Sequence, residues 1–267
     1  MKSVIGSWFG RTGNNFIQVI NCIYYSFYLN DFEEIQFPNH PLLMGNSIKN
    51  QENKSYDTSN KMIKNNFFYA KKLGFQLHPY QMREITQKYI INIVNLNVNA
   101  EGNDNHLYIH VRGGDAMSDY VFLLQNPLKL YKMILTENKY EKIIIVYQDT
   151  HNPIIEYLKR LNHPKLYFQS SSIKNDIETL CQAKNFLMCL STFDAMIYCL
   201  SKNISHILIP QFMIDEWYPD MKWNIPMTLF SFENYTIERW KKMRYNEKRH
   251  LLINYDGEIL KNHDNLG

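Results

Sequence analysis

A cation, an imidazole and a carboxylate occur within six residues near the middle of the chain. The segment His110–Asp115 contains all three, and Gly113 and Gly114 stand between the arginine and the aspartate. Glycine permits positive φ angles and the close approach of a ligand, and the planar guanidinium of Arg112 suits phosphate oxygens. The segment therefore predicts a clamp for a diphosphate. In the alternative interpretation, Arg112 and Asp115 pair only with each other at a turn.

The elements around this segment indicate where it lies in the fold. The apolar run 107–111 directly precedes the glycines and predicts a buried strand. Further strands are expected at 142–147, 166–168, 186–190 and 206–209, and helices at 127–136, 152–161, 175–183 and 193–201. Strands that alternate with helices in this way predict an α/β fold with a parallel sheet covered on both faces. Open sheets of this class bind ligands at the carboxyl ends of their strands.

Polar side chains follow two more of the expected strands. Asp149 comes shortly after the strand 142–147, and Ser191 and Thr192 follow the strand 186–190. Since parallel strands end at the same edge of a sheet, these side chains should share one crevice with Arg112.

The first third of the chain has a different pattern. A strand at 4–9, a loop at 10–15, a helix at 16–29 and a short strand at 35–37 are expected, followed by an irregular polar connection at 45–66 and a helix at 80–98. A cluster of helix breakers at 99–105 then predicts the domain boundary. We expect an N-terminal α/β domain over 1–102 and a Rossmann-like C-terminal domain over 103–267.

Composition excludes several classes of protein. Among 267 residues the net charge is only +3, which argues against nucleic acid as a partner. Four cysteines stand in apolar contexts without a C-x-x-C pair and are expected to be reduced core residues, and no histidine spacing predicts a metal site on one helix. The chain begins without a long apolar stretch, so we expect no transmembrane segment and a cytoplasmic location.

Three separated motifs together resemble a known family. The segment His110–Asp115 resembles the H-x-R-R-x-D element of the inverting GT-B glycosyltransferases of the α1,2-, α1,6- and protein O-fucosyltransferase group. The segment from Asp176 to Phe193 is similar to the D-x-x-x-L-x-x-A…S-[ST]-F element of these enzymes, and Gly10–Phe16 resembles their G-x-x-G-N-Q loop. The motifs follow the order of the family and span about residues 6–210.

The resemblance implies a fold and an activity. It implies two Rossmann-like lobes with a cleft between them, the N-terminal lobe on the acceptor side and the C-terminal lobe binding a nucleotide sugar. The implied reaction is the transfer of fucose, or a related deoxyhexose, from a GDP-sugar to a glycan hydroxyl. The partners would be the nucleotide-sugar donor and the glycan acceptor, and no metal or cofactor would be needed.

The same resemblance implies roles for individual residues. Arg112 would hold the β-phosphate of the donor, and the other residues implied at the donor nucleotide are His110, Asp176, Ser191, Thr192, Phe193, Gly13 and Asn14. Arg112, His110 and Asp115 are the candidates for catalysis. Gly113 stands where many family members have a second arginine, so one phosphate contact is missing or is supplied from elsewhere.

For several of these residues the sequence leaves an alternative open. Asp176 is placed equally well to cap a helix at 177–183, and His110 could be satisfied by the backbone at a strand end. Asn14 and Asn15 are of a type common in loops. The catalytic base is Asp115, Asp119 or the departing phosphate itself.

The sequence also leaves alternatives open for three aromatic residues, and it leaves alternatives open for the activity itself. Trp217, Tyr218 and Trp223 either stack on acceptor sugars or pack in the core, and a basic helix at 237–252 is expected to present a solvated face. The alternative functions are a non-catalytic module that binds a nucleotide sugar or a glycan, and the same chemistry with another nucleotide sugar.

Overall fold

The structure is a computed structural model that describes residues 1–51, 62–119 and 121–264. The chain divides into two compact units. The N-terminal unit comprises Met1–Asn97 with Ala195–Leu200, and the C-terminal unit comprises Val98–Asp194 with Ser201–Gly267. The division between Asn97 and Val98 lies a few residues before the boundary expected from the breaker cluster.

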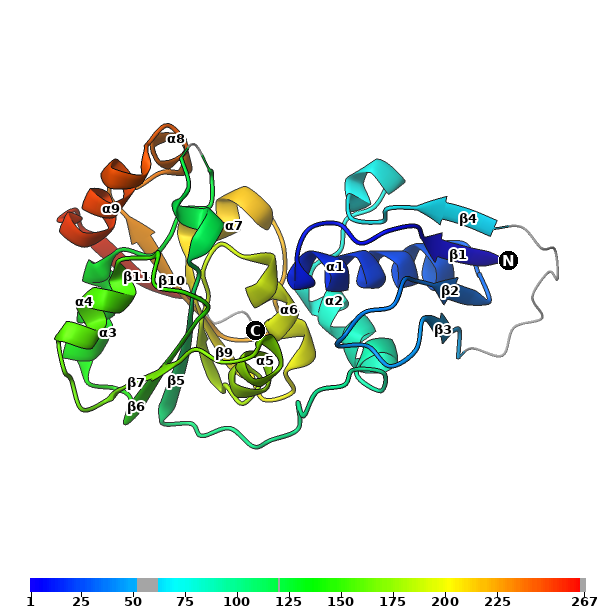
Figure 1. Ribbon diagram of the computed structural model, residues 1–267, viewed down its shortest axis with the longest axis horizontal. Coiled ribbons are helices and arrows are strands. Elements are labelled where there is room, and N and C mark those ends of the chain that lie inside the picture. Colours follow the sequence, from blue (N-terminus) through cyan, green and yellow to red (C-terminus); the bar gives the residue numbers. More distant parts are fainter. Residues whose placement is uncertain (52–61, 120, 265–267) are drawn as a thin grey trace. The chain divides into compact units, whose positions relative to one another are not determined.

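The N-terminal unit is built on a small sheet with the strand order β3-β2-β1-β4. Its strands are β1 (Lys2–Ile5), β2 (Glu34–Gln36), β3 (Ser47–Lys49) and β4 (Met62–Asn65). β1 pairs in parallel with β2 and β4, and β3 is antiparallel to β2. The helices are α1 (Thr12–Ile23), which continues as a wider turn through Leu29, and α2 (Pro79–Ile85), which continues through Ile90; a short 3-10 turn covers Ala70–Leu73 (Figure 1).

Helix α1 forms because its apolar residues recur on one face. Phe16, Val19, Ile20 and Ile23 are spaced by three or four residues, and all four are buried. The sequence predicted this helix correctly as a helix.

The first strand, expected at 4–9, lies nearer the start of the chain, because β1 ends at Ile5. The segment after β1 is held by the side-chain amide of Gln18 on α1, which donates to the carbonyl of Ser7 and accepts the N–H of Phe9.

Other expectations for this unit were wrong. The connection 45–66 was expected to be irregular, yet β3 and β4 lie within it; its residues 52–61 are outside the described part of the chain. Both are edge strands of three or four residues with little apolar surface, so their sequences lack the apolar run of a buried strand. The helix expected at 80–98 ends at Ile90.

The C-terminal unit contains a larger sheet with the strand order β11-β10-β9-β8-β5-β6-β7. Its strands are β5 (His106–Val111), β6 (Lys142–Tyr147), β7 (Leu166–Gln169), β8 (Asn185–Leu187), β9 (His206–Pro210), β10 (Met227–Phe232) and β11 (Ile259–Asp264). Only β11 is antiparallel to its neighbour among these paired strands. From β5 the chain builds outward through β6 and β7, then returns to the other side of β5 and builds outward through β8, β9 and β10.

This order has a consequence for ligand binding. The parallel strands follow the pattern 3-2-1-4-5-6 of doubly wound nucleotide-binding sheets, in which the direction of winding reverses between the first and fourth strands. Here the reversal lies between β5 and β8. Loops that leave these two strands diverge to opposite faces and open a crevice at the carboxyl edge, where such sheets bind ligands. The expectation of an α/β fold is therefore confirmed, and this sheet is compatible with a Rossmann-like fold.

Helices cover both faces of this sheet. They are α3 (Leu128–Glu137), α4 (Ile154–Arg160), α5 (Ile173–Leu180), α7 (Gln211–Trp217), α8 (Ile237–Trp240) and α9 (Tyr245–Asn254). Helix α6 (Thr192–Leu200) begins in this unit, and its residues Ala195–Leu200 are grouped with the N-terminal unit. Figure 1 shows α3, α4 and α9 on one face and α5 on the other. Each strand and helix expected between residues 106 and 210 is present, with ends shifted by a few residues. No helix in the described part of the chain has the length and apolar character needed to cross a membrane.

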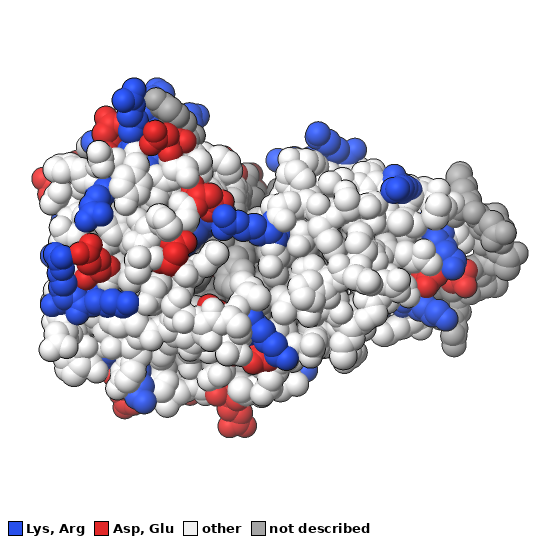
Figure 2. Space-filling model, in the orientation of Figure 1, with Lys and Arg blue, Asp and Glu red and all other residues white. Residues whose placement is uncertain are grey.

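Two expectations about side chains had different outcomes. The four cysteines are buried and free, as predicted. The basic helix expected at 237–252 is instead broken into α8 and α9, and Lys248 on α9 is fully buried rather than solvated. On the face seen in Figure 2, basic and acidic side chains alternate over the C-terminal unit, so this face has no continuous basic patch.

Candidate functional site

Arg112 follows β5 directly and is held on two sides. Its Nε and Nη2 donate to the carboxylate of Asp115 over 3.0–3.3 Å, and its Nη1 donates to Ser191 Oγ over 3.1 Å. The Arg112 side chain is 17% exposed, whereas that of Asp115 is 40% exposed. The ion pair of the alternative interpretation is therefore present, but it is not the only contact that the guanidinium makes.

Ser191 connects the two motifs that the sequence placed far apart. It directly precedes α6, and its Oγ accepts the N–H of Phe193, which is the geometry of a helix N-cap. Because Ser191 follows β8 and Arg112 follows β5, their contact lies at the reversal of the sheet. Thr192 and Phe193 form the first turn of α6, whose N-terminus favours anions.

The glycine turn is shaped by Asp149, which follows β6. Its Oδ1 accepts the N–H of Gly114 over 3.1 Å, and it also accepts the N–H and Nδ1 of His151, each over 2.9 Å. Partial burial alone would raise the pKa of Asp149, but the hydrogen bonds from His151 and Gly114 outweigh it and hold this pKa below its ordinary value. The prediction that Asp149 shares the edge of the sheet with Arg112 is confirmed.

His110 is engaged by a carboxylate that the sequence analysis did not identify. Its Nδ1 bonds Oδ1 of Asp194, and the other oxygen of Asp194 accepts the N–H of Cys189 over 2.6 Å. His110 and Asp194 are buried, and the ring of Phe193 lies 4.8 Å from that of His110, centroid to centroid. The alternative in which the backbone satisfies His110 is therefore wrong.

His110, Cys189 and Asp194 are also the types of residue that bind metals. Their ligand atoms lie within 4.8 Å of one another. However, both oxygens of Asp194 already accept hydrogen bonds, and burial together with the Asp194 charge raises the pKa of the Cys189 thiol well above its ordinary value. Since a thiol must lose its proton to bind a metal, this cluster fits a hydrogen-bonded core better than a metal centre. A site without metal remains our prediction.

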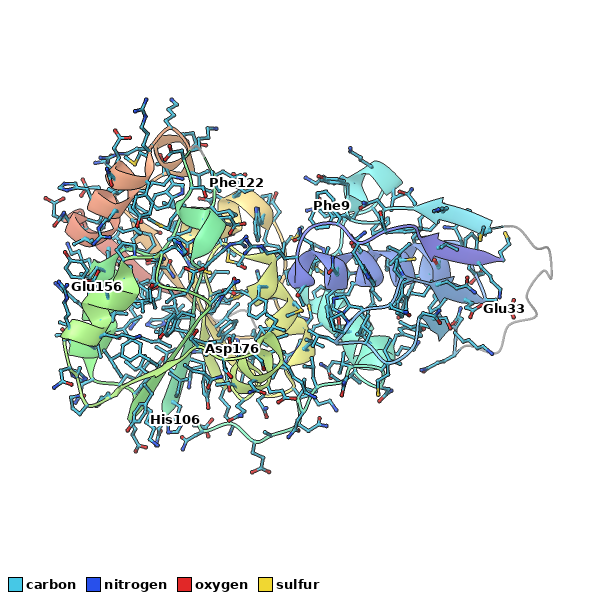
Figure 3. The ribbon with its side chains drawn as sticks, viewed as in Figure 1. Phe9, Glu33, His106, Phe122, Glu156 and Asp176 are labelled. Carbon is cyan, nitrogen blue, oxygen red and sulfur yellow. The ribbon has the colours of Figure 1, made fainter. Side chains whose placement is uncertain are left out.

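Asp176 does not cap a helix. α5 begins earlier than expected, and its N-cap is Ser172, whose Oγ accepts the N–H of Asn175 over 3.2 Å. Asp176, which Figure 3 labels, is buried within the first turns of α5. Its carboxylate accepts a hydrogen bond from Nε2 of Gln169 over 3.0 Å and one from the N–H of Ser171 over 3.4 Å. The capping interpretation was wrong, and the nucleotide role of Asp176 remains a prediction.

The loop at 10–15 belongs to the N-terminal unit and is described within it. Gly13 and Asn14 lie in the first turn of α1, where Gly13 is buried. Asn15 is also buried, and its Nδ2 donates to the carbonyl of Phe9, which Figure 3 labels, over 3.1 Å. Asn15 therefore braces the loop, while the roles of Gly13 and Asn14 at a donor remain predictions.

The remaining candidates are occupied by structural contacts. Asp119 accepts the N–H of Tyr245 over 2.7 Å, which ties it to the start of α9. Trp223 and Tyr218 are buried and meet edge to face with centroids 5.0 Å apart, so these two aromatic residues pack in the core. Trp217 is partly exposed and lies 6.4 Å from the ring of Tyr218.

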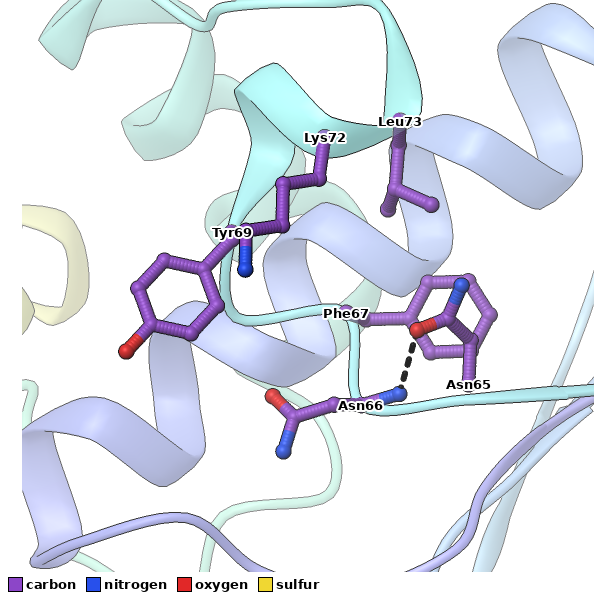
Figure 4. A pocket seen from close by; sticks show the side chains of 6 residues that line it. All are labelled: Asn65, Asn66, Phe67, Tyr69, Lys72 and Leu73. Carbon is purple, nitrogen blue, oxygen red and sulfur yellow. Dashed lines mark hydrogen bonds between the residues drawn. The ribbon is translucent and has the colours of Figure 1, made fainter.

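A pocket in the N-terminal unit lies outside the motifs of the sequence analysis. Its volume is about 390 Å³, and Figure 4 shows the residues that line it: Asn65, Asn66, Phe67, Tyr69, Lys72 and Leu73. Phe67 is buried with a positive φ of 58°, which is strained for a bulky side chain. The side-chain oxygen of Asn65 accepts the N–H of Asn66, and that of Asn66 accepts the N–H of Phe68, so both hold this turn in shape.

The described residues thus bring together three polar strand ends. The loops after β5, β6 and β8 supply Arg112, Asp149 and Ser191 to one edge of the parallel sheet. No family model matches the chain, and no curated protein or solved structure matches it either. A function for this site is therefore argued from its geometry and chemistry.

Proposed function

We propose that the chain is an inverting, metal-independent glycosyltransferase of the two-lobed GT-B type. It moves fucose, or a related deoxyhexose, from a GDP-sugar to a glycan hydroxyl. The observation that supports this most is the 3.1 Å contact between Arg112 Nη1 and Ser191 Oγ, which joins the H-x-R and S-T-F segments at the reversal point of the sheet.

Arg112 has the chemistry that the leaving group requires. As the bond between the sugar and the β-phosphate breaks, negative charge grows on the phosphate and must be stabilised by positioned donors. Asp115 occupies the side of the guanidinium formed by Nε and Nη2, so a phosphate oxygen would approach from the Nη1 side, where Ser191 lies. The N-terminus of α6 lies there too and adds a favourable dipole.

The same arrangement gives Asp115 a role in the reaction. A phosphate that bonds the guanidinium would compete for it with the Asp115 carboxylate, which is the more exposed partner of the ion pair. The acceptor hydroxyl would then lose its proton to Asp115 as its oxygen bonds the anomeric carbon and the diphosphate leaves with the electron pair on the opposite face. Asp119 is less suited to this role because it is bonded to the start of α9.

A second candidate is a non-catalytic module that binds a nucleotide sugar. The observation that favours it is the ion pair itself, because a guanidinium that keeps its contact with Asp115 has less charge to offer a leaving group.

The two candidates are separated by measuring GDP release from GDP-fucose, with and without a set of acceptor glycans. Thermal-shift ranking of GDP, UDP and TDP would identify the preferred base in parallel. Acceptor-dependent GDP release supports the transferase. Binding of nucleotide sugars without release or transfer would support the binding module instead.

A further inference from the structure

His110 and Arg112 reach the same helix from the same strand. The two residues are two positions apart on β5 and at its end, so their side chains leave the same face of the sheet. Arg112 bonds Ser191, which caps α6, and His110 bonds Asp194 in the first turn of α6. The imidazole and the guanidinium therefore lie side by side at one helix N-terminus.

Asp194 determines which ring nitrogen of His110 is available. A fully buried carboxylate is costly unless donors surround it, and Asp194 is bonded by the N–H of Cys189 and by Nδ1 of His110. Nδ1 must therefore carry a proton. Nε2 makes no hydrogen bond to any residue that the structure describes, and the His110 side chain retains 10% exposure. Nε2 is thus the nitrogen left for a ligand.

Asp194 and Cys189 contact Nδ1 of His110 directly. Tyr131 on α3, and Arg112, which follows the strand of His110, interact electrostatically with this pair of residues. Burial raises the pKa of Cys189 and of Tyr131, so both are neutral around neutral pH. The charge of Arg112 is balanced by Asp115. Asp194 is therefore the anion that acts most directly on His110.

We propose that Asp194 is a positioning residue that fixes His110 with a proton on Nδ1, so that Nε2 takes up a second proton when the nucleotide sugar binds and donates it to a phosphate oxygen. The proton comes from solvent, no covalent bond changes, and the imidazolium lies between two anions. This inference rests on the proposed function, because it requires a diphosphate beside Arg112. The imidazolium of His110 would supply the positive charge that Gly113 cannot.

The test measures protons taken up on binding. GDP-fucose is a suitable probe because its diphosphate is esterified at both ends and does not titrate near neutral pH. Calorimetry at about pH 8 in buffers of different ionisation enthalpy should show that the wild-type protein takes up protons when GDP-fucose binds. The affinity of the wild-type protein for GDP-fucose should accordingly fall as the pH rises, because a proton is taken up on binding.

Asp194→Asn is the informative variant. The amide can accept from Cys189 and donate to Nδ1, which turns the ring into the neutral tautomer with its proton on Nε2. Proton uptake should then disappear, and the affinity at about pH 7 should fall by about tenfold or more, because a neutral donor replaces a charged one. His110→Gln should likewise abolish proton uptake. The exposed Asp215→Asn and the half-buried His206→Gln are matched controls that should behave as wild type.

Each outcome decides one proposal. If GDP-fucose binds and the wild-type protein takes up no proton, or if Asp194→Asn still takes one up, the role of Asp194 is wrong while the proposed function stands. If no GDP-, UDP- or TDP-sugar binds, the proposed function fails. Should Asp194→Asn not fold, ¹⁵N NMR of the wild-type protein above about pH 8 decides, since our inference requires the proton on Nδ1 of His110 and a proton on Nε2 would overturn it.

Discussion

The carboxylate of Asp149 occupies the space that a side chain at Gly113 would need. A Cβ added at residue 113 would lie 2.1 Å from Oδ1 of Asp149 and 2.7 Å from Cγ. Asp149 cannot easily withdraw, since it is bonded to Gly114 and His151. With Asp149 in this position, there is no room for an arginine side chain at residue 113.

This relationship predicts a compensating pair of substitutions. Gly113→Ala should lower the free energy of unfolding by about 1–3 kcal/mol, as expected for overpacking, because its methyl group collides with a held carboxylate. In an Asp149→Ala background the colliding atoms are gone, and the same change should cost clearly less. Urea unfolding of the single and double variants measures the coupling. Additive effects of the two changes would show that the collision is not what requires glycine at residue 113.

Lys248 predicts an unusual dependence of stability on pH. Its Nζ donates to the carbonyls of Ser118 and Val121, and burial lowers its pKa to about 8. The folded protein therefore binds fewer protons at this site than the unfolded chain between pH 8 and the ordinary lysine pKa of 10.5. The cost of burying the charge is fully present below pH 8 and is relieved as the pH rises through this window.

The measurement compares variants at several pH values. The unfolding free energy of wild type minus that of Lys248→Met should increase between about pH 8 and pH 10, by on the order of 1–3 kcal/mol. The difference between wild type and Lys242→Met, which changes an exposed lysine before α9, should stay nearly constant. A Lys248→Met difference that is flat across the window would mean that Lys248 is not desolvated in solution.

Asp176 and Ser172 allow the nucleotide role of α5 to be separated from its stability. Ser172→Ala removes the N-cap and should lower the free energy of unfolding by about 1 kcal/mol without changing the preference among nucleotides. Asp176→Asn should instead weaken GDP by about tenfold relative to UDP, because a guanine reader loses its charged acceptor. Competition of GDP and UDP against a fluorescent nucleotide measures this ratio. An unchanged ratio in Asp176→Asn would leave Asp176 with only its bonds to Gln169 and Ser171.

The strands β5, β6, β8 and β9 could be predicted because most of their residues are buried. Buried parallel strands are continuous apolar runs, and 107–111 and 143–146 stand out between polar turns. The edge strands β3 and β4 could not be predicted in the same way, since their pairing depends on neighbours that are distant in sequence rather than on their own apolar content.

The site residues that directly follow an apolar strand could be predicted from the sequence. The contacts between residues far apart in the sequence could not. Arg112 and Ser191 each follow an apolar strand, so their shared edge could be inferred. The pairing of His110 with Asp194 joins residues 84 positions apart. An aspartate in the first turn of a helix is common for electrostatic reasons alone, so it gave no signal. Lys248 was misread because a basic residue in a helical pattern usually faces water.

The most direct test of the proposed function is the transfer rate of Arg112 variants. Arg112→Ala should abolish acceptor-dependent GDP release from GDP-fucose, and Arg112→Lys should not restore the full rate, since an ammonium cannot bind two oxygens in a planar fork. The surface variant Arg160→Ala, which breaks an exposed pair with Glu156, should transfer at the wild-type rate. If folded Arg112→Ala turns over GDP-fucose as fast as the wild-type protein, the clamp at the sheet edge is not the centre of the reaction.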